Sequence, residues 1–257
     1  MSWERSIIIK TPAEIETMRA AGRINAEALA AARSVIRPGA TTADIDAAAA
    51  EVLKKHHAKP AFLGVMGAYA YPATTTVSVN DELVHGIPGK RKLVEGDIVS
   101  VDCGTIFEGF VADSAFSCGV GEIPEAAQHL LEVTEKSLYI GIKELKVGNR
   151  TGDVGHAIQT FVEGEGYHLT REYTGHGVGR SMWEGPQCPN YGTPGRGVPL
   201  RPGMTIALEP MVLVGTPQTR VLPDQWTVAS ADGSLTCHFE HTTAITENGP
   251  DILTVAG

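Results

Sequence analysis

Two aspartates interrupt an apolar stretch that otherwise has the pattern of paired β-strands. The stretch is VDCGTIFEGFVADS, residues 101–114, and the acids are Asp102 and Asp113. Valine, cysteine, alanine and phenylalanine flank the two carboxyl groups, which indicates that both are buried. Because a buried carboxylate needs a partner, any fold of this chain has to supply one.

The same stretch predicts a β-hairpin whose turn covers residues 106–109. That turn would set Asp102 directly opposite Asp113, with the two Cβ atoms about 4.5–5.5 Å apart. Two like charges so close are unfavourable, and one carboxyl group would normally hold a proton. A divalent cation between the carboxylates removes this repulsion. The alternative is a pair of exposed aspartates on the solvent face of the hairpin.

Four further titratable residues lie in apolar strands or glycine-rich turns. Glu209 interrupts the apolar string TIALEPMVLV, and Glu240 lies in TCHFEHTTAIT. His176 is flanked by glycines in YTGHGVGR, and His85 precedes a Gly-Ile-Pro turn. Each alone has an ordinary structural explanation, such as an edge strand or a loop. Together with the aspartates they form four acids and one or two histidines, for which chance is a poor account.

The charges of this set favour a metal cluster. Four ionised carboxylates balance two divalent ions, and the neutral cluster could hold a bridging hydroxide. A set of carboxylates with one imidazole suits manganese, iron, cobalt or zinc. It lacks the thiolates that bind a structural zinc. Metal ions paired about 3.5–4 Å apart recur in hydrolytic enzymes. The sequence therefore predicts a hydrolytic site with two divalent ions, whose identity stays open.

A second hairpin is expected in WTVASADGSLTCHFE, residues 226–240, with its turn at Gly233. It would place Trp226 across from Glu240, where the aromatic ring could form the apolar wall of a side-chain pocket. The remaining histidines of interest are expected to be structural or exposed: His129, His238 and His241.

Charge and composition exclude several classes of partner. The chain has 257 residues and a formal net charge of −9, whereas nucleic acid or an anionic membrane calls for a basic face. The four cysteines are scattered without a CxxC pair, which is typical of free thiols in a reducing compartment. We find no signal-peptide pattern and no stretch near the roughly 20 apolar residues of a membrane span. We therefore expect a cytoplasmic protein.

Capping signals and periodicity predict an α+β fold. Helices are expected over about 12–35, 42–57, 124–146 and 151–165, the first opened by Thr11-Pro12-Ala13-Glu14. Strands are expected near 76–80, 97–105, 110–120, 204–214, 225–230 and 236–246. This order favours a single domain over residues 1–257, in which two similar halves are conceivable.

The ordered set Asp102, Asp113, His176, Glu209 and Glu240 resembles the five metal ligands of the type I methionine aminopeptidases. The surrounding strings are similar too: NDELVHGIPG, GDIVSVDCGT, GFVADS, GHGVGR, LEPM and FEHTTAIT. The resemblance runs over nearly the whole chain, without the N-terminal extension of eukaryotic members. It implies the pita-bread fold with pseudo-twofold halves. It also implies removal of the initiator methionine from nascent chains when the second residue is small.

The resemblance further implies a role for each ligand. Asp102 and Asp113 would hold metal, with Asp113 bridging both ions. Glu240 would also bridge, and His176 and Glu209 would bind the same single ion. A metal-bridged hydroxide would attack the scissile carbonyl, with Glu209 as the general base that takes its proton.

Further roles follow from the same resemblance. His85 is similar to the family's histidine near the scissile amide, which does not bind metal. A monovalent cation near Asn80 is implied by analogy. The resemblance also implies a monomer that meets nascent chains, with transient ribosome contact left open. The methionine pocket would be lined by Val65, Tyr71, Met182, Trp183 and Trp226.

Three positions depart from the family pattern. Trp183 stands where we expect a histidine near the substrate carbonyl, Met182 where an aromatic residue is common, and Ala68 where a tyrosine is common. An indole can donate a hydrogen bond but cannot transfer a proton. One alternative is thus a relative with altered specificity or reduced catalysis, and another is a non-catalytic binding protein. A prolidase or aminopeptidase P is a third, although such enzymes usually carry an extra N-terminal domain.

Overall fold

The structure is a computed structural model that describes residues 7–256. It has four helices, which are α1 (Pro12–Val35), α2 (Thr42–Lys55), α3 (Glu125–Glu144) and α4 (Thr151–Gly164). The first strands are β1 (Lys59–Pro60), β2 (Thr75–Val79), β3 (Glu82–Val84), β4 (Ile98–Phe107), β5 (Phe110–Gly119), β6 (His168–Leu169), β7 (Gly175–Gly177) and β8 (Glu184–Cys188). The remaining strands are β9 (Thr205–Leu208), β10 (Met211–Leu213), β11 (Thr219–Val221), β12 (Val228–Ser230), β13 (Thr236–His238), β14 (Glu240–Thr246) and β15 (Gly249–Ile252).

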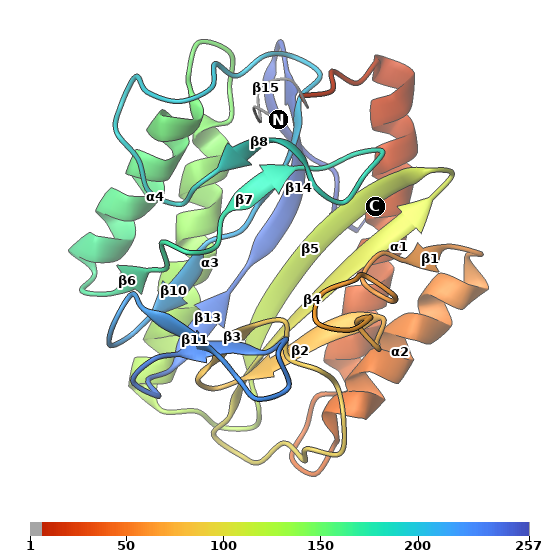
Figure 1. The fold of residues 1–257 in the computed structure, drawn as a ribbon, viewed down its shortest axis with the longest axis vertical. Helices are drawn as coiled ribbons and strands as arrows, with labels where there is room; N and C mark the ends of the chain where they lie inside the picture. The colour runs from red at the N-terminus through yellow and green to blue at the C-terminus, as the bar shows by residue number, and fades with distance from the viewer. Residues whose placement is uncertain (1–6, 257) are drawn as a thin grey trace.

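A nine-stranded antiparallel sheet forms the centre of the molecule. Its strand order is β1-β4-β5-β14-β9-β7-β8, with β2 paired to β4 and β15 paired to β14. Two three-stranded sheets, β13-β10-β6 and β11-β12-β3, complete the fold. The helices lie in two pairs, α1 with α2 beside one half of the strands and α3 with α4 beside the other (Figure 1). This arrangement confirms the expected α+β class.

The helix positions follow from local signals. Thr11 and Glu14 form the predicted capping box at the start of α1, and Thr41 and Asp44 form another at the start of α2. Each box satisfies backbone N–H groups that would otherwise lack a partner. All four helices lie within about two residues of the ranges predicted from sequence. No helix in residues 7–256 is long and apolar enough to cross a membrane.

Asn25 on α1 connects this helix to the central hairpin of β4 and β5. Its side chain is fully buried. The Nδ2 group donates to the carbonyl oxygen of Cys103 and to the Thr105 hydroxyl, and Oδ1 accepts from the Ser114 hydroxyl. Each of these partners is next to, or three residues from, one of the two strand aspartates. A single buried amide therefore fixes the helix against both strands beside the acids.

Two of the expected strands are interrupted in the structure. The range 204–214 is divided into β9 and β10 at Glu209-Pro210, and 236–246 is divided into β13 and β14 at Phe239. Proline has no N–H to donate to a ladder, which explains the first interruption. The two parts of each range join different sheets, so each glutamate lies where the chain leaves one sheet for another.

The expected hairpin over residues 226–240 is wrong. β12 pairs with β11 and β3, whereas β13 pairs with β10. Thr236, the first residue of β13, donates its N–H to the Asn80 carbonyl oxygen, and its hydroxyl group donates to the Asn80 and Glu82 carbonyl oxygens. These non-local bonds replace the local pairing, so Trp226 and Glu240 are not cross-strand neighbours. All four cysteines are free, as the sequence predicts.

The close contact between α1 and the C-terminal segment gives a stability prediction. A Cβ at Gly22 would overlap the backbone carbonyl of Leu253, whereas a Cβ at Gly164, the last residue of α4, would meet nothing within 4 Å. We expect Gly22→Ala to lower the unfolding free energy by about 1–3 kcal/mol through overpacking.

Thermal and urea unfolding measure this effect, and Gly164→Ala is the matched control. The control should raise the unfolding free energy by no more than about 1 kcal/mol. Equal stability of Gly22→Ala and wild type would contradict the packing described for α1.

Candidate metal centre and active site

The five predicted ligands come from adjacent elements of the central sheet. Asp102 lies in β4, Asp113 in β5 and His176 in β7, while Glu240 is the first residue of β14 and Glu209 follows β9 directly. These strands are successive neighbours in the order β4-β5-β14-β9-β7. Antiparallel pairing therefore brings together residues that are up to 138 positions apart in the chain (240 minus 102).

The predicted register of the first hairpin is wrong by two residues. Asp102 pairs with Ala115, and Asp113 pairs with Gly104. The turn is Glu108-Gly109, where both residues have positive φ, at 48° and 81°, as a two-residue type I′ turn requires. The aspartates are consequently diagonal rather than opposite neighbours. Because side chains alternate with a period of two, a two-residue shift leaves both on the same face.

The ligand atoms converge on a small volume. Single atoms of Asp113, His176 and Glu240 lie within 4.8 Å of one another, and all three residues are buried. His176 Nε2 is 4.0 Å from Asp113 Oδ2 and 3.6 Å from Glu209 Oε1. The other ring nitrogen, Nδ1, lies 2.9 Å from the Gly177 carbonyl oxygen and donates to it. This bond fixes the ring so that Nε2 faces the carboxylates.

Three buried carboxylate oxygens of this cluster have no hydrogen-bond partner in the described part of the chain. They are Asp102 Oδ1, Asp113 Oδ1 and Glu240 Oε1. An unpaired buried oxygen of this kind is costly. Hard and borderline divalent cations are bound by carboxylate oxygen and imidazole nitrogen. The donor set therefore fits a divalent metal.

Burial raises the pKa of all four acids, and repulsion from neighbouring carboxylates adds to this effect for three of them. For Asp113, Glu209 and Glu240, burial and then the neighbouring carboxylates hold the pKa well above the ordinary range. Burial also raises the pKa of Asp102. Conversely, burial lowers the pKa of His176 and keeps its imidazole neutral. A cation would stabilise the charged carboxylates and reverse these shifts.

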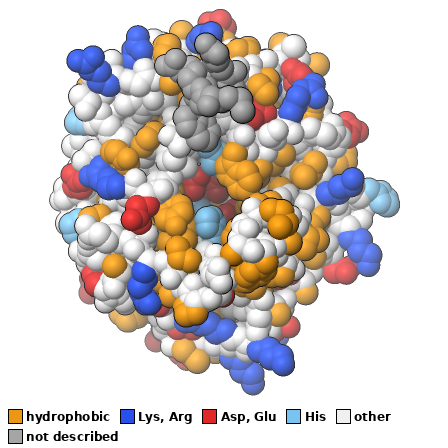
Figure 2. Space-filling view, in the orientation of Figure 1, with side chains coloured by type: hydrophobic (Ala, Val, Ile, Leu, Met, Phe, Trp, Pro, Cys, Tyr) orange, Lys and Arg blue, Asp and Glu red, His pale blue; other side chains and the backbone are white. Residues whose placement is uncertain are grey.

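A cavity of about 340 Å³ opens over the cluster. In Figure 2 it is a hollow in the middle of the face, with acidic and histidine side chains at its floor and apolar side chains around it. Asp102, Asp113, His176, Glu209 and Glu240 all contribute to its wall. So do all the predicted pocket residues, which are Val65, Tyr71, Met182, Trp183 and Trp226.

Comparison with known proteins identifies this arrangement. A model of metallopeptidase family M24 matches residues 16–247. The chain belongs to metallopeptidase family M24. It is 48% identical to the methionine aminopeptidase of Clostridium acetobutylicum, over 97% of this chain and 99% of the relative. It is 49% identical to methionine aminopeptidase 1 of Bacillus subtilis, over 96% of this chain and 99% of the relative.

Solved structures agree with this family M24 assignment. The methionine aminopeptidase of Thermotoga maritima superposes with a TM-score of 0.93 at 51% identity, covering 96% of this chain and 99% of that one. A prolidase from Pyrococcus horikoshii superposes with a TM-score of 0.78 at 23% identity and shares the fold, covering 99% of this chain and 65% of the prolidase. The fold is thus the pita-bread fold, and this family M24 metallopeptidase uses divalent metal.

A sixth residue of the cluster, His238, was expected from the sequence to be structural or exposed and was not selected as a site residue. Its side chain is buried, and Nε2 lies 3.7 Å from Glu209 Oε2 and 3.9 Å from Glu240 Oε2. Burial, followed by the nearby His85, lowers the pKa of His238 to about 3. His238 precedes Glu240 by two positions. The period of a strand could have placed both side chains on one face.

The pocket wall also includes residues that sequence reasoning did not select. Phe62, Thr76 and Met211 line the cavity together with the predicted set. Trp226 packs edge-on against Tyr71, with ring centroids 5.1 Å apart. The Tyr71 hydroxyl donates to the carbonyl oxygens of Thr75 and Gly86, at 3.0 and 2.9 Å. The apolar end of the cavity therefore has rigid aromatic walls.

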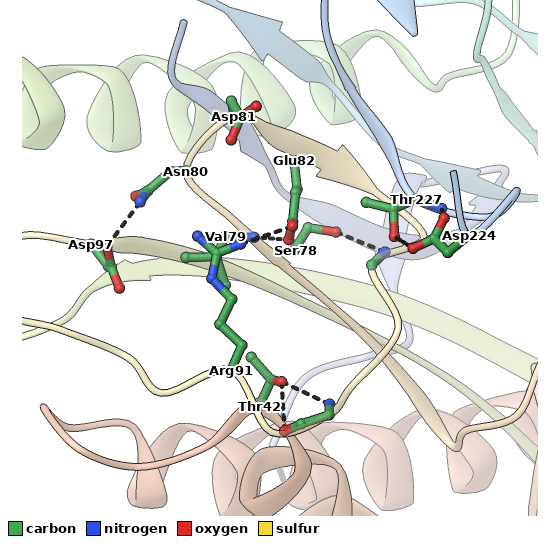
Figure 3. A network of polar contacts seen from close by, with 12 residues as sticks. Thr42, Ser78, Val79, Asn80, Asp81, Glu82, Arg91, Asp97, Asp224 and Thr227 are labelled. Atoms are coloured by element: carbon green, nitrogen blue, oxygen red, sulfur yellow. Dashed lines mark hydrogen bonds and ion pairs between the residues drawn. The ribbon is translucent and has the colours of Figure 1, made fainter. Parts of the chain in front are cut away.

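His85 lies on the wall of the cavity in a constrained backbone conformation, with φ of 62°. The neighbouring Gly86 N–H donates to Ser78 Oγ at 3.1 Å. Figure 3 shows Ser78 and, near it, the polar contacts that join Asn80 to Asp97 and Glu82 to Arg91, each at 2.8 Å. The bond from Gly86 to Ser78, together with the bond from the Val77 N–H to the Gly86 carbonyl oxygen, anchors the turn that carries His85. Burial lowers the pKa of His85 to about 4, so the ring is neutral.

Trp183 lies at the rim of the cavity, with 53% of its surface exposed. Its ring centroid is 6.4 Å from that of His176. The adjacent Glu184 forms a buried ion pair with Lys10, and its other oxygen accepts the N–H groups of Arg180 and Ser181. The segment before Trp183 is thus fixed, while the indole itself projects to the opening.

The raised carboxyl pKa values predict how the stability of the metal-stripped protein depends on pH. A carboxyl whose pKa is higher in the folded state binds more protons there than in the unfolded state. Its stabilising contribution is complete below the unfolded pKa, near 4, and is lost as pH rises through the folded value. We expect the Tm of metal-stripped protein to fall between pH 5 and pH 8, and saturating Mn²⁺ to restore it at pH 8.

Asp113→Asn is the matched variant for this titration, since it removes one of the repelling carboxylates. It should flatten the dependence of Tm on pH in metal-stripped protein. A wild-type Tm that stays constant from pH 5 to pH 8 without metal would contradict the electrostatics described for the cluster.

Proposed function

We propose that this metallopeptidase removes the N-terminal methionine from peptides and nascent proteins, with preference for a small second residue. The observation that carries the proposal is one cavity that joins a carboxylate-rich metal cluster to a pocket with aromatic walls. The high similarity to methionine aminopeptidases over the full chain supports it.

The α-ammonium group and the side chain of an N-terminal methionine are each complementary to one part of the cavity. Its free α-ammonium group carries a positive charge and suits the acidic floor, which accounts for action at a chain end. Its thioether side chain is flexible and makes favourable contacts with aromatic rings. Tyr71 and Trp226 supply such rings, and Val65 and Met182 add apolar surface.

In this proposal Asp102, Asp113, His176, Glu209 and Glu240 would hold two divalent ions. When bound, the ions supply Lewis acidity that polarises a carbonyl group and acidifies water at neutral pH. A set of carboxylates with one imidazole suits manganese, iron, cobalt and zinc. A monovalent cation near Asn80 is a further part of the proposal, supported by the convergence of the Asn80 and Glu82 carbonyl oxygens on the Thr236 hydroxyl.

Glu209 is the acid that we assign as general base. Its side chain is 14% exposed, whereas those of Asp113 and Glu240 are 3% and 2% exposed. Glu209 therefore has the best access to a proton in the cavity. It would take the proton of the attacking water and deliver it to the leaving amine. His85, neutral and on the same wall, would hydrogen-bond to the substrate near the scissile amide.

The proposal describes one catalytic domain over residues 1–257 that acts as a monomer in the cytoplasm. The single family match over residues 16–247 supports one domain. A transient contact with the ribosome would deliver nascent chains to the cavity.

Release of free methionine tests the proposal directly. We expect metal-stripped protein to be inactive and Mn²⁺ or Co²⁺ to restore release from Met-Ala-Ser. The larger second residue of Met-Lys-Ser should reduce release strongly. If no peptide with N-terminal methionine is cleaved although the protein binds divalent metal, the proposed function is wrong and a binding role is favoured.

Removing the general base tests the role of Glu209. We expect Glu209→Gln to lower kcat by about 10²–10⁴-fold, because an amide cannot accept the proton. Glu247→Gln, at an exposed position in the turn after β14, is the control and should leave kcat unchanged. Wild-type kcat in Glu209→Gln at saturating metal would assign the base elsewhere.

A relative with altered specificity or reduced catalysis is the second candidate function, and Trp183 is the observation that favours it. The indole occupies the cavity rim where the resemblance calls for a histidine, and it cannot transfer a proton. We expect Trp183→His to raise kcat with Met-Ala-Ser by about tenfold, which is less than the contribution of a well-placed general acid or base. An unchanged or lower kcat would show that Trp183 does not limit catalysis.

A further inference from the structure

His238 is a buried polar side chain whose position the proposed mechanism does not explain. It belongs to the short strand β13, and its side chain is 2% exposed. Its Nε2 atom has no hydrogen-bond partner in residues 7–256. A buried imidazole nitrogen without a partner is costly. The surroundings of Nε2 therefore indicate what this residue is for.

Two carboxylates of the metal cluster lie closest to this nitrogen. Glu209 Oε2 is 3.7 Å away and Glu240 Oε2 is 3.9 Å away. The opposite oxygen of the first acid, Glu209 Oε1, lies 3.6 Å from His176 Nε2. Glu209 therefore stands between two imidazoles, with one oxygen directed to each.

The two imidazoles differ in what else surrounds them. His176 groups with Asp113 and Glu240, the three residues whose ligand atoms lie within 4.8 Å of one another. His238 lies on the other side of the Glu209 carboxylate and is not part of that group. No hydrogen bond reaches the Glu209 carboxylate from any residue of the described chain, since Asn190 bonds only to its backbone carbonyl oxygen. His238 Nε2, at 3.7 Å, is within reach of Oε2 as a donor.

We propose that His238 is a positioning residue for Glu209, whose Nε2–H donates to Oε2 while Oε1 faces the metal. A rotation that shortens the present distance by roughly 0.7 Å gives an N–H···O bond of ordinary length. This inference rests on the proposed role of Glu209 as ligand and general base. Partners of this kind orient metal ligands, and their loss typically costs about 10–100-fold in metal affinity or activity.

A pair of substitutions separates hydrogen bonding from packing. Gln can donate an N–H from nearly the same place as the histidine, whereas Leu fills the space without a donor. We expect His238→Leu to weaken Mn²⁺ binding by about 10–100-fold and to lower kcat by a similar factor, with KM changed less than about threefold. His238→Gln should retain both properties within about threefold. His238→Phe is a second variant without a donor, in case the leucine protein does not fold.

Isothermal titration of metal-stripped protein with Mn²⁺ gives the affinity independently of activity, and thermal unfolding verifies that each variant is folded. Wild-type affinity and kcat in a folded His238→Leu would overturn the proposal. Equal loss in His238→Gln and His238→Leu would overturn it too, because it would indicate that His238 binds metal itself or only packs. If the wild type releases no methionine, the proposed function fails, but the three affinities still decide the role of His238.

Discussion

The repulsion among four buried carboxylates is the constraint on which the rest of this structure depends. Asp102, Asp113, Glu209 and Glu240 lie together in the central sheet. Burial raises the pKa of each, and the neighbouring carboxylates raise that of Asp113, Glu209 and Glu240 further. Apolar side chains in place of these acids would avoid that electrostatic cost. Their presence is explained by cations that neutralise them. A bound divalent metal would supply Lewis acidity and would also neutralise the carboxylates at the centre of the sheet.

The architecture around the acids brings this cluster together from distant parts of the chain. Each candidate ligand comes from one of five neighbouring antiparallel strands, β4, β5, β14, β9 and β7. Four lie within their strand, and Glu209 directly follows β9. Asn25 holds α1 against the two strands that carry the aspartates. The chain passes from one sheet to another at Glu209-Pro210 and at Phe239. Glu209 therefore follows the end of β9, and Glu240 begins β14. Rigid packing of this kind is what a preorganised site requires.

Local chemistry was readable from the sequence. The capping boxes at Thr11 and Thr41 placed two helices, because their hydrogen bonds join residues three apart. The five candidate ligands could be selected because each stands in a short string with a strong family resemblance, and the structure brings all five to one cavity. The α+β class followed from the order of these segments.

Non-local pairing was not readable. The register of Asp102 and Asp113 depends on positive φ at Glu108, which a non-glycine residue rarely adopts. The hairpin over 226–240 failed because Thr236 bonds to Asn80, 156 residues away. His238 was missed for the same reason, since its significance lies in Glu209 on another strand. The sequence itself shows Trp183 where the family pattern has a histidine, whereas the imidazole that β13 contributes to the cluster became visible only in the structure.

Anomalous diffraction from crystals grown with Mn²⁺ tests the central claim most directly, because it locates the ions without reference to activity. The account predicts two manganese peaks among Asp102, Asp113, His176, Glu209 and Glu240. Peaks only outside this set, or ordered carboxylates with no ion at saturating Mn²⁺, would contradict it. In that case protonation of the carboxyl groups, rather than bound metal, would have to explain how four acids are buried together.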